Sequence, residues 1–98
     1  IMIEIRKTEV FDKWLTGLRD LRARAKIEVR IRRLSLGNAG DVKPVGGGVS
    51  ELRIPDGKGY RVYFVSKGAV LIILLCGGNK SSQKSDINKA KALAKDLE

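Results

Sequence analysis

The chain contains no histidine, one cysteine and few aromatic residues. Without histidine, no imidazole can bind a metal, act as a general base or form the middle of a catalytic triad. With Cys76 as the single cysteine, neither an intrachain disulfide nor a zinc site built from cysteines can form. Aromatic residues make up 5% of the chain, so the core must consist mainly of Leu, Ile, Val and Ala. The composition therefore excludes histidine-based and cysteine-based metal sites, and we expect the protein to use no metal and no other cofactor.

Long apolar segments are also absent. The longest apolar run, 69–76, is far shorter than the ~20 residues that a membrane-spanning helix requires. Near the N-terminus, Glu4 and Arg6 interrupt the apolar residues, so this segment lacks the core of a signal peptide. We therefore expect no membrane association and a reducing, cytoplasmic location, with Met2 as the native start.

Positive charge is in large excess. The 98 residues include 20 Lys and Arg against 11 Asp and Glu, which gives a net charge of +9. Most of this excess lies in residues 19–36 and 51–83, which indicates a folded basic surface rather than a basic tail. The length and the hydrophobic fraction of 43% fit one domain over residues 1–98. A small basic domain usually binds an anionic partner, and nucleic acid is the first candidate.

The apolar pattern predicts an α+β fold with the element order β-α-α-β-β-β-α. The last three strands are expected to form an antiparallel meander with the first strand at its edge, and two helices are expected to form an antiparallel hairpin on one face. The run 69–76 indicates a central strand covered on both faces, and the glycine-rich segment 37–48 indicates a loop. The expected strands are 1–6, 49–54, 60–65 and 69–76. The expected helices begin after Thr8, after Asp20 and after Ser82 or Ser85, and end near Leu18, Leu36 and Leu97.

Two arginines are expected to lie opposite each other in the sheet. A turn centred on Gly57 would pair Arg53 with Arg61. Like charges opposite each other are unfavourable, so this pair suggests a bound anion, and phosphate fits the forked guanidinium group. Lys80, after the next strand, could reach the same place. In a different register, the two arginines would point separately into solvent.

Other residues have candidate roles in binding. Tyr63 shares a strand face with Arg61 and could stack on a base, and Gln83 could orient a substrate. Trp14 and Phe11 are expected in the core because of their helical spacing. One face of the second helix is basic, and it is either a surface for an anionic partner or a solvated face without a specific function. The basic residues on that face are Arg19, Arg22, Lys26, Arg30 and Arg33.

The chain contains five short segments that carry a family resemblance: E-I-R-K-T at 4–8, F-D-K-W-L at 11–15, E-L-R-I-P at 51–55, G-Y-R-V-Y-F at 59–64 and C-G-G-N-K-S-S-Q-K-S-D-I at 76–87. In this order and spacing they resemble the RelE/ParE superfamily of type II toxins, in particular the HigB-like addiction module killer branch related to phage proteins. The resemblance implies the compact RelE fold, with an antiparallel sheet, a helical hairpin on one face and a C-terminal helix. It also implies a partner antitoxin of the helix-turn-helix DNA-binding type, in a toxin–antitoxin heterotetramer.

The resemblance further implies an endoribonuclease that enters the ribosomal A site and cuts mRNA during translation. In this reaction the 2′-hydroxyl attacks the adjacent phosphate, a base takes its proton and cations stabilise the phosphorane. Carried over by position, Arg61 corresponds to the central active-site arginine, Arg53 to a basic RNA contact and Lys80 to the basic residue after the last strand. Asp86 lies near the position where relatives place a tyrosine or another proton-transfer group. This sequence has no tyrosine after Tyr63.

Two other functions stay open at this point. A ParE-like protein would inhibit DNA gyrase by binding, without catalysis. An inactive relative would only bind nucleic acid or act as an antitoxin. ParE-type toxins typically lack a cluster of basic active-site residues, so Arg53, Arg61 and Lys80 favour the nuclease.

Overall fold

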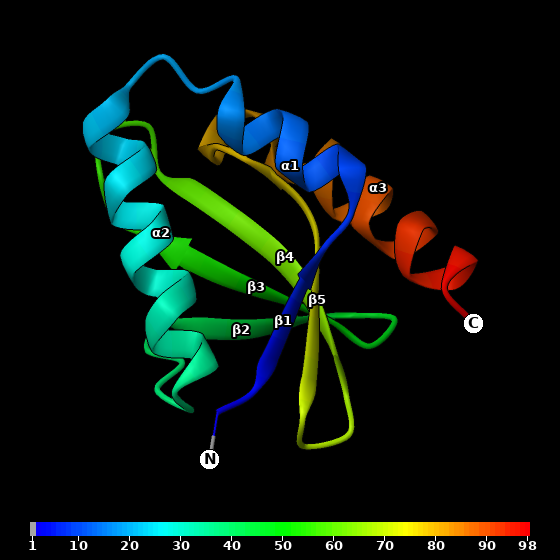
Figure 1. The fold of residues 1–98 in the computed structure, drawn as a ribbon. Helices are drawn as coiled ribbons and strands as arrows, with labels where there is room; N and C mark the ends of the chain where they lie inside the picture. Colours follow the sequence, from blue (N-terminus) through cyan, green and yellow to red (C-terminus); the bar gives the residue numbers. More distant parts are fainter. Residues whose placement is uncertain (1) are drawn as a thin grey trace.

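The computed structural model describes residues 2–98, so Ile1, which was expected to begin the first strand, lies outside the described residues. Five strands form one sheet in the order β1-β5-β4-β3-β2 (Figure 1). The strands are β1 (Glu4–Lys7), β2 (Val42–Gly46), β3 (Val49–Ile54), β4 (Tyr60–Lys67) and β5 (Leu71–Gly78). The helices are α1 (Glu9–Thr16), α2 (Leu21–Ser35) and α3 (Gln83–Asp96), with the short 3-10 helix η1 (Lys80–Ser82) before α3.

The predicted α+β class is confirmed, and the first strand joins the edge of the meander as expected. β1 pairs with β5 in parallel, whereas the other neighbouring strands are antiparallel. Two of the three predicted N-caps are present, whereas Ser82 precedes α3 without a capping hydrogen bond from its side chain. The Thr8 Oγ1 accepts a hydrogen bond from the Phe11 backbone N (3.0 Å), and the Asp20 Oδ1 accepts one from the Ala23 backbone N (3.0 Å).

The prediction of a loop over 37–48 was wrong in its second half, because this segment contains β2. Pro44 lacks the N–H that a central strand needs, but β2 is an edge strand, where that donor is not required. Gly46, Gly47 and Gly48 all have positive φ and close the tight turn into β3. The glycines that indicated a loop therefore belong to a hairpin turn, and the element order gains one strand.

The two faces of the sheet carry separate apolar cores. α1 and α2 cover one face, where they pack on Leu52, Ile54, Val62 and other inward-facing strand residues. α3 covers the other face with Ala90 and Ala94 (Figure 1). β5 lies between β1 and β4 and is covered on both faces, as its continuous apolar sequence predicted. Because strand residues alternate between faces, Arg53 and Arg61 lie on the face of α3.

Within residues 2–98, no helix combines the length and the apolar character that crossing a membrane would require.

Candidate active site

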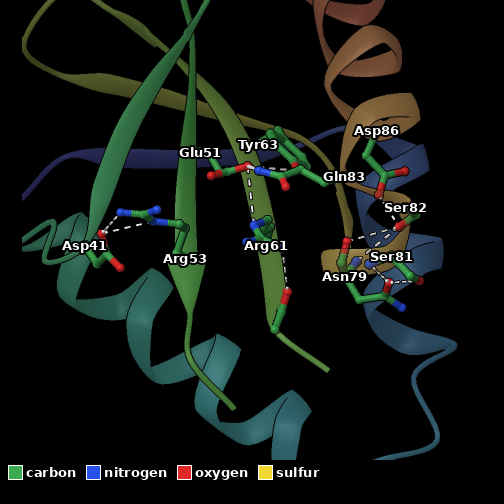
Figure 2. A network of polar contacts seen from close by, with 11 residues as sticks. Asp41, Glu51, Arg53, Arg61, Tyr63, Asn79, Ser81, Ser82, Gln83 and Asp86 are labelled. Carbon is green, nitrogen blue, oxygen red and sulfur yellow. Dashed lines mark hydrogen bonds and ion pairs between the residues drawn. The ribbon is translucent and has the colours of Figure 1, made fainter. Parts of the chain in front are cut away.

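The predicted register of the two arginines is confirmed. Arg53 lies directly opposite Arg61 in the β3–β4 pair. The side chains, however, turn to different partners (Figure 2). The Arg53 Nη2 and Nε lie 2.9 and 3.2 Å from the Asp41 Oδ1, and this hydrogen bonding, together with the charge of Asp41, raises the pKa of Arg53 above its ordinary value. Arg53 is thus charged and partly exposed, but its guanidinium group is already paired.

Arg61 is held by a buried carboxylate. Its Nε lies 3.5 Å from the Glu51 Oε2, and the Arg61 side chain is 13% exposed while that of Glu51 is 1% exposed. The Nε is buried and has no hydrogen bond within residues 2–98, so this ion pair is what compensates for its burial. The Nη1 donates to the Gly59 carbonyl oxygen (3.3 Å). The Nη2 has no protein partner among the described residues, and it is therefore the part of Arg61 that is available to a ligand.

Glu51 is the centre of this network and was missed by the sequence reasoning. Its Oε2 accepts hydrogen bonds from the Tyr63 hydroxyl (3.1 Å) and from the Gln83 Nε2 (2.9 Å), in addition to the ion pair with Arg61 (Figure 2). One signal was available, because the expected β3–β4 register places an acidic residue opposite Tyr63 and on the same face as Arg61. A buried carboxylate is costly unless it is paired, so all three neighbours are needed.

Two predicted substrate contacts have supporting positions instead. Tyr63 has no exposed surface, so its ring cannot stack on a base in this arrangement. Burial raises its pKa well above the ordinary value, and the charge and hydrogen bond of Glu51 act in the same direction, so the phenol stays protonated. Gln83 uses its amide N–H on Glu51. Both residues therefore hold Glu51 and, through it, Arg61.

Lys80 lies beside Arg61 at the turn before β4. A Cβ atom on Gly59 would be 3.2 Å from the Lys80 Cβ and 3.8 Å from the Arg61 Nη1, so both basic side chains border the same residue. The Lys80 backbone N donates to the Lys58 carbonyl oxygen (3.1 Å), which fixes η1 against this turn. Lys80 is exposed. The structure thus brings Lys80 and Arg61 together, while the Arg53 guanidinium turns to Asp41.

Asp86 lies over the end of β5 in the first turn of α3. Gly78 is the β5 residue that pairs with Arg61, and a Cβ atom at this position would overlap the Asp86 carboxylate. The Ser82 hydroxyl donates to the Asp86 Oδ2, whereas the Oδ1 has no hydrogen bond among the described residues (Figure 2). The missing side chain at Gly78 therefore allows a carboxylate to sit beside the strand that carries Arg61.

The basic face of α2 is separate from this site. Arg22, Lys26, Arg30 and Arg33 line a groove of about 460 Å³ that contains neither Arg61 nor Lys80. The Arg30 guanidinium group is engaged in the fold, because it donates to the carbonyl oxygens of Arg53 (2.7 Å) and Ala39 (3.2 Å). Lys26 pairs with the Asp56 carboxylate at 3.2 Å. The candidate binding residues of α2 therefore lie apart from the strand site.

No candidate metal centre accompanies these residues. Across the part of the chain that the structure describes, no three His, Cys, Asp or Glu side chains are grouped as ligands of one ion. The chemistry that the site around Gly59 offers consists of the positive charges of Arg61, which is held by Glu51, and of the exposed Lys80, with the Asp86 carboxylate nearby.

Comparison with known proteins identifies the family. The profile of "Phage derived protein Gp49-like (DUF891)" matches residues 13–97. The chain belongs to this family. Gp49-like proteins are a RelE-like toxin family, so the coarser part of the resemblance stated above is confirmed. An uncharacterized protein of Haemophilus influenzae is 56% identical over 95 residues, which cover 97% of this chain and 96% of that protein.

A solved structure agrees on the fold of this Gp49-like protein. The toxin–antitoxin complex RelBE2 from Mycobacterium tuberculosis contains a chain that matches with a TM-score of 0.64 at 19% sequence identity. The match covers 82% of the present chain and 100% of that chain. The predicted RelE-like architecture is therefore confirmed.

Proposed function

We propose that this Gp49-like protein is the toxin of a type II toxin–antitoxin module, of the HigB-like branch, and that residues 1–98 act as one domain that cleaves mRNA on the ribosome. The observation that carries the proposal is the corner at Gly59, where the side chains of Arg61 and Lys80 border the same residue, with the Arg61 Nη2 unpaired and Lys80 exposed. Two neighbouring cationic side chains suit a phosphodiester whose negative charge increases during the reaction.

In the proposed reaction, the 2′-hydroxyl of one nucleotide attacks the adjacent phosphorus, and the bond from that phosphorus to the 5′ oxygen of the next nucleotide breaks. Arg61 and Lys80 stabilise the phosphorane charge, and the leaving 5′ oxygen takes a proton from water or from the Lys80 ammonium group. Asp86 is the proposed proton acceptor, because its Oδ1 is unpaired and its carboxylate lies over the β5 residue that pairs with Arg61. The ribosome would align the mRNA for this attack. Such positioning by itself can account for a large part of a rate enhancement. Arg53 would contact the RNA backbone after exchanging Asp41 for a phosphate.

We further propose a cognate antitoxin, of helix-turn-helix type, that neutralises the toxin in the cytoplasm and assembles with it as a heterotetramer. The fold match to a chain of a toxin–antitoxin complex supports such a partner. The net charge of +9 favours a partner with an acidic segment.

One observation favours a second candidate, a relative that binds nucleic acid or gyrase without cleaving RNA. Both strand arginines are paired with carboxylates, Arg53 with Asp41 and Arg61 with Glu51, which lowers the free positive charge of the strand face. Such a protein would stop growth without cutting mRNA, or would not stop growth at all.

The deciding experiment compares the wild type with Lys80→Ala in a translation reaction, with cleavage sites mapped by primer extension. Lys80 is exposed, so this change leaves folding intact, and Lys67→Ala at the far end of β4 is the matched control. We expect the loss of one charge-stabilising contact to lower the cleavage rate by ~10²–10³-fold, by analogy with the removal of one oxyanion donor. Arg61→Lys, checked for folding by circular dichroism, should also lower the rate. Translation without new mRNA ends would refute the nuclease, and equal cleavage by Lys80→Ala and the wild type would refute the role of Lys80 in the site.

A further inference from the structure

A second cavity lies next to the Lys80 corner, between the end of α1 and the start of β4. Its volume is about 400 Å³, which is within the range of small-ligand pockets. A neighbouring hollow contains Lys80 and shares two lining residues, Lys58 and Asn79, with this cavity, so the two are adjacent. The lining residues that matter below are Trp14, Arg19, Asp20, Lys58, Tyr60 and Asn79.

One wall of the cavity is aromatic. The rings of Trp14 and Tyr60 meet edge to face, with centroids 6.4 Å apart. The six-membered ring of Trp14 lies over Gly77, where a Cβ atom would overlap it. The helical spacing of Trp14 predicted a core residue. In the structure it is partly buried and packs against the edge of the core. The indole Nε1 makes no hydrogen bond with any of residues 2–98, so Trp14 brings an unused donor to the lining of the cavity.

The polar residues of the cavity also have unused hydrogen-bonding groups. The Asn79 Oδ1 is occupied, because it accepts from the Ser81 backbone N (2.9 Å) and the Ser81 Oγ (2.6 Å), but the Nδ2 has no partner in the described chain. The Asp20 Oδ1 caps α2 by accepting from the Ala23 N, which leaves the Oδ2 free. A ring with both donors and acceptors on its edge, as a nucleobase has, would match this set.

Positive charge borders the same cavity. Arg19 and Lys58 have no carboxylate within ion-pair distance among residues 2–98. Together with Lys80 they form a basic border from the corner at Gly59 to the link between α1 and α2. Arg61 lies on the α3 face of the sheet and Tyr60 on the opposite face. A ribose–phosphate chain that passes around the turn at Gly59, from Lys80 along this border, would therefore place one base at the aromatic wall.

We propose that this cavity binds the base of a nucleotide that flanks the scissile phosphate, with Trp14 and Tyr60 against the ring and Asn79 and Asp20 at its edge. The proposal rests on the proposed ribonuclease function, because it takes the phosphate to lie at Arg61 and Lys80. It identifies a single-stranded RNA base as the ligand, and base–aromatic contacts are a general way in which proteins bind such strands.

Trp14 is the only tryptophan in the chain, so its fluorescence reports on the cavity alone. The probe is a trinucleotide with methylated 2′-hydroxyl groups, which cannot be cleaved, compared with two copies that lack the first or the third base. We expect the intact trinucleotide to quench Trp14, and one of the abasic copies to bind ~10–100-fold more weakly without quenching. Equal quenching by all three, or no change in Trp14 emission with any of them, would overturn the proposal.

A second test changes the edge contact without removing the helix cap. Asp20→Asn keeps an oxygen that can cap α2 but replaces the free carboxylate oxygen with an amide donor. We expect the order of affinity for trinucleotides with each of the four flanking bases to change, whereas Asp12→Asn on the exposed side of α1 leaves it unchanged. An unchanged order in Asp20→Asn would show that the cavity does not contact the base edge.

Neither measurement needs catalysis, so the two proposals can fail separately. Base-dependent quenching without mRNA cleavage would leave the cavity as a nucleotide site and remove the nuclease. Cleavage without base-dependent quenching would keep the nuclease and remove the cavity as a nucleotide site.

Discussion

The two strand arginines provide a paired test of how burial changes the importance of an ion pair. Arg61 pairs with Glu51, whose side chain is 1% exposed, whereas Arg53 pairs with Asp41, whose side chain is 49% exposed. The two arginines occupy opposite positions in one strand pair, so the local backbone is nearly the same. Replacing each acid by alanine therefore isolates the effect of the surroundings of the pair.

The expected losses follow from what each substitution leaves behind. Glu51→Ala leaves the buried Arg61 Nε without its counter-charge and removes the acceptor of the Tyr63 hydroxyl and the Gln83 amide. Removing one partner of a buried pair costs about 3–5 kcal/mol of unfolding free energy. Asp41→Ala leaves Arg53 in water, which solvates it, so the loss should be too small to separate from zero.

The assay is urea unfolding followed by circular dichroism, with thermal unfolding as a second measurement. A loss of 3 kcal/mol corresponds to a drop of roughly 12 °C or more in Tm for a domain of this size. Glu51→Gln should lose less than Glu51→Ala, about 1–3 kcal/mol, because an amide oxygen can still accept from Tyr63. Equal unfolding free energies for Glu51→Ala and Asp41→Ala would show that Glu51 is not the residue that holds this network.

Two further predictions concern β5. Gly78→Ala should lower the free energy of unfolding by about 1–3 kcal/mol, because the added methyl group overlaps the Asp86 carboxylate. In urea unfolding, the double variant Gly78→Ala with Asp86→Ala should recover part of this loss, and no recovery would contradict the overlap. Burial, reinforced by the charge of Asp86, raises the pKa of the Cys76 thiol to about 11, so the thiol stays protonated at pH 9 and should react with iodoacetamide far more slowly in the native than in the unfolded protein. Equal rates would show that the thiol is exposed and ionised.

The strand core and the caps were predictable because each depends on short-range sequence pattern. Alternation over 49–54 and 60–65, with the turn at Gly57, was enough to place Arg53 opposite Arg61. β2 was not predictable in this way. Its Pro44 and its closing glycines are usual in loops, and only the position at the sheet edge makes them compatible with a strand.

The site was less predictable than the sheet, because register fixes Cα positions and not the direction of long side chains. The sequence placed both arginines correctly in the sheet. Their guanidinium groups, however, turn to carboxylates that the register does not pair with them, Asp41 for Arg53 and Glu51 for Arg61. The position of Asp41 depends on the end of the segment before β2, and the sequence predicts only a loop there. The burial of Glu51 depends on α3, whose Gln83 reaches across from residues far along the chain.

Because their carboxylate partners differ, the two arginines are also expected to bind RNA differently. Arg53 must exchange an exposed carboxylate for a phosphate, so the gain from one contact is offset by the loss of another. Arg61 is held from behind through its Nε, and its Nη2 can meet a phosphate while the pair with Glu51 stays intact. A group that is already ordered and partly desolvated loses little freedom when the charge of the transition state develops. Arg61, with Lys80 beside it, is therefore the stronger candidate for stabilising the phosphorane, and Arg53 for weaker contact with the RNA backbone.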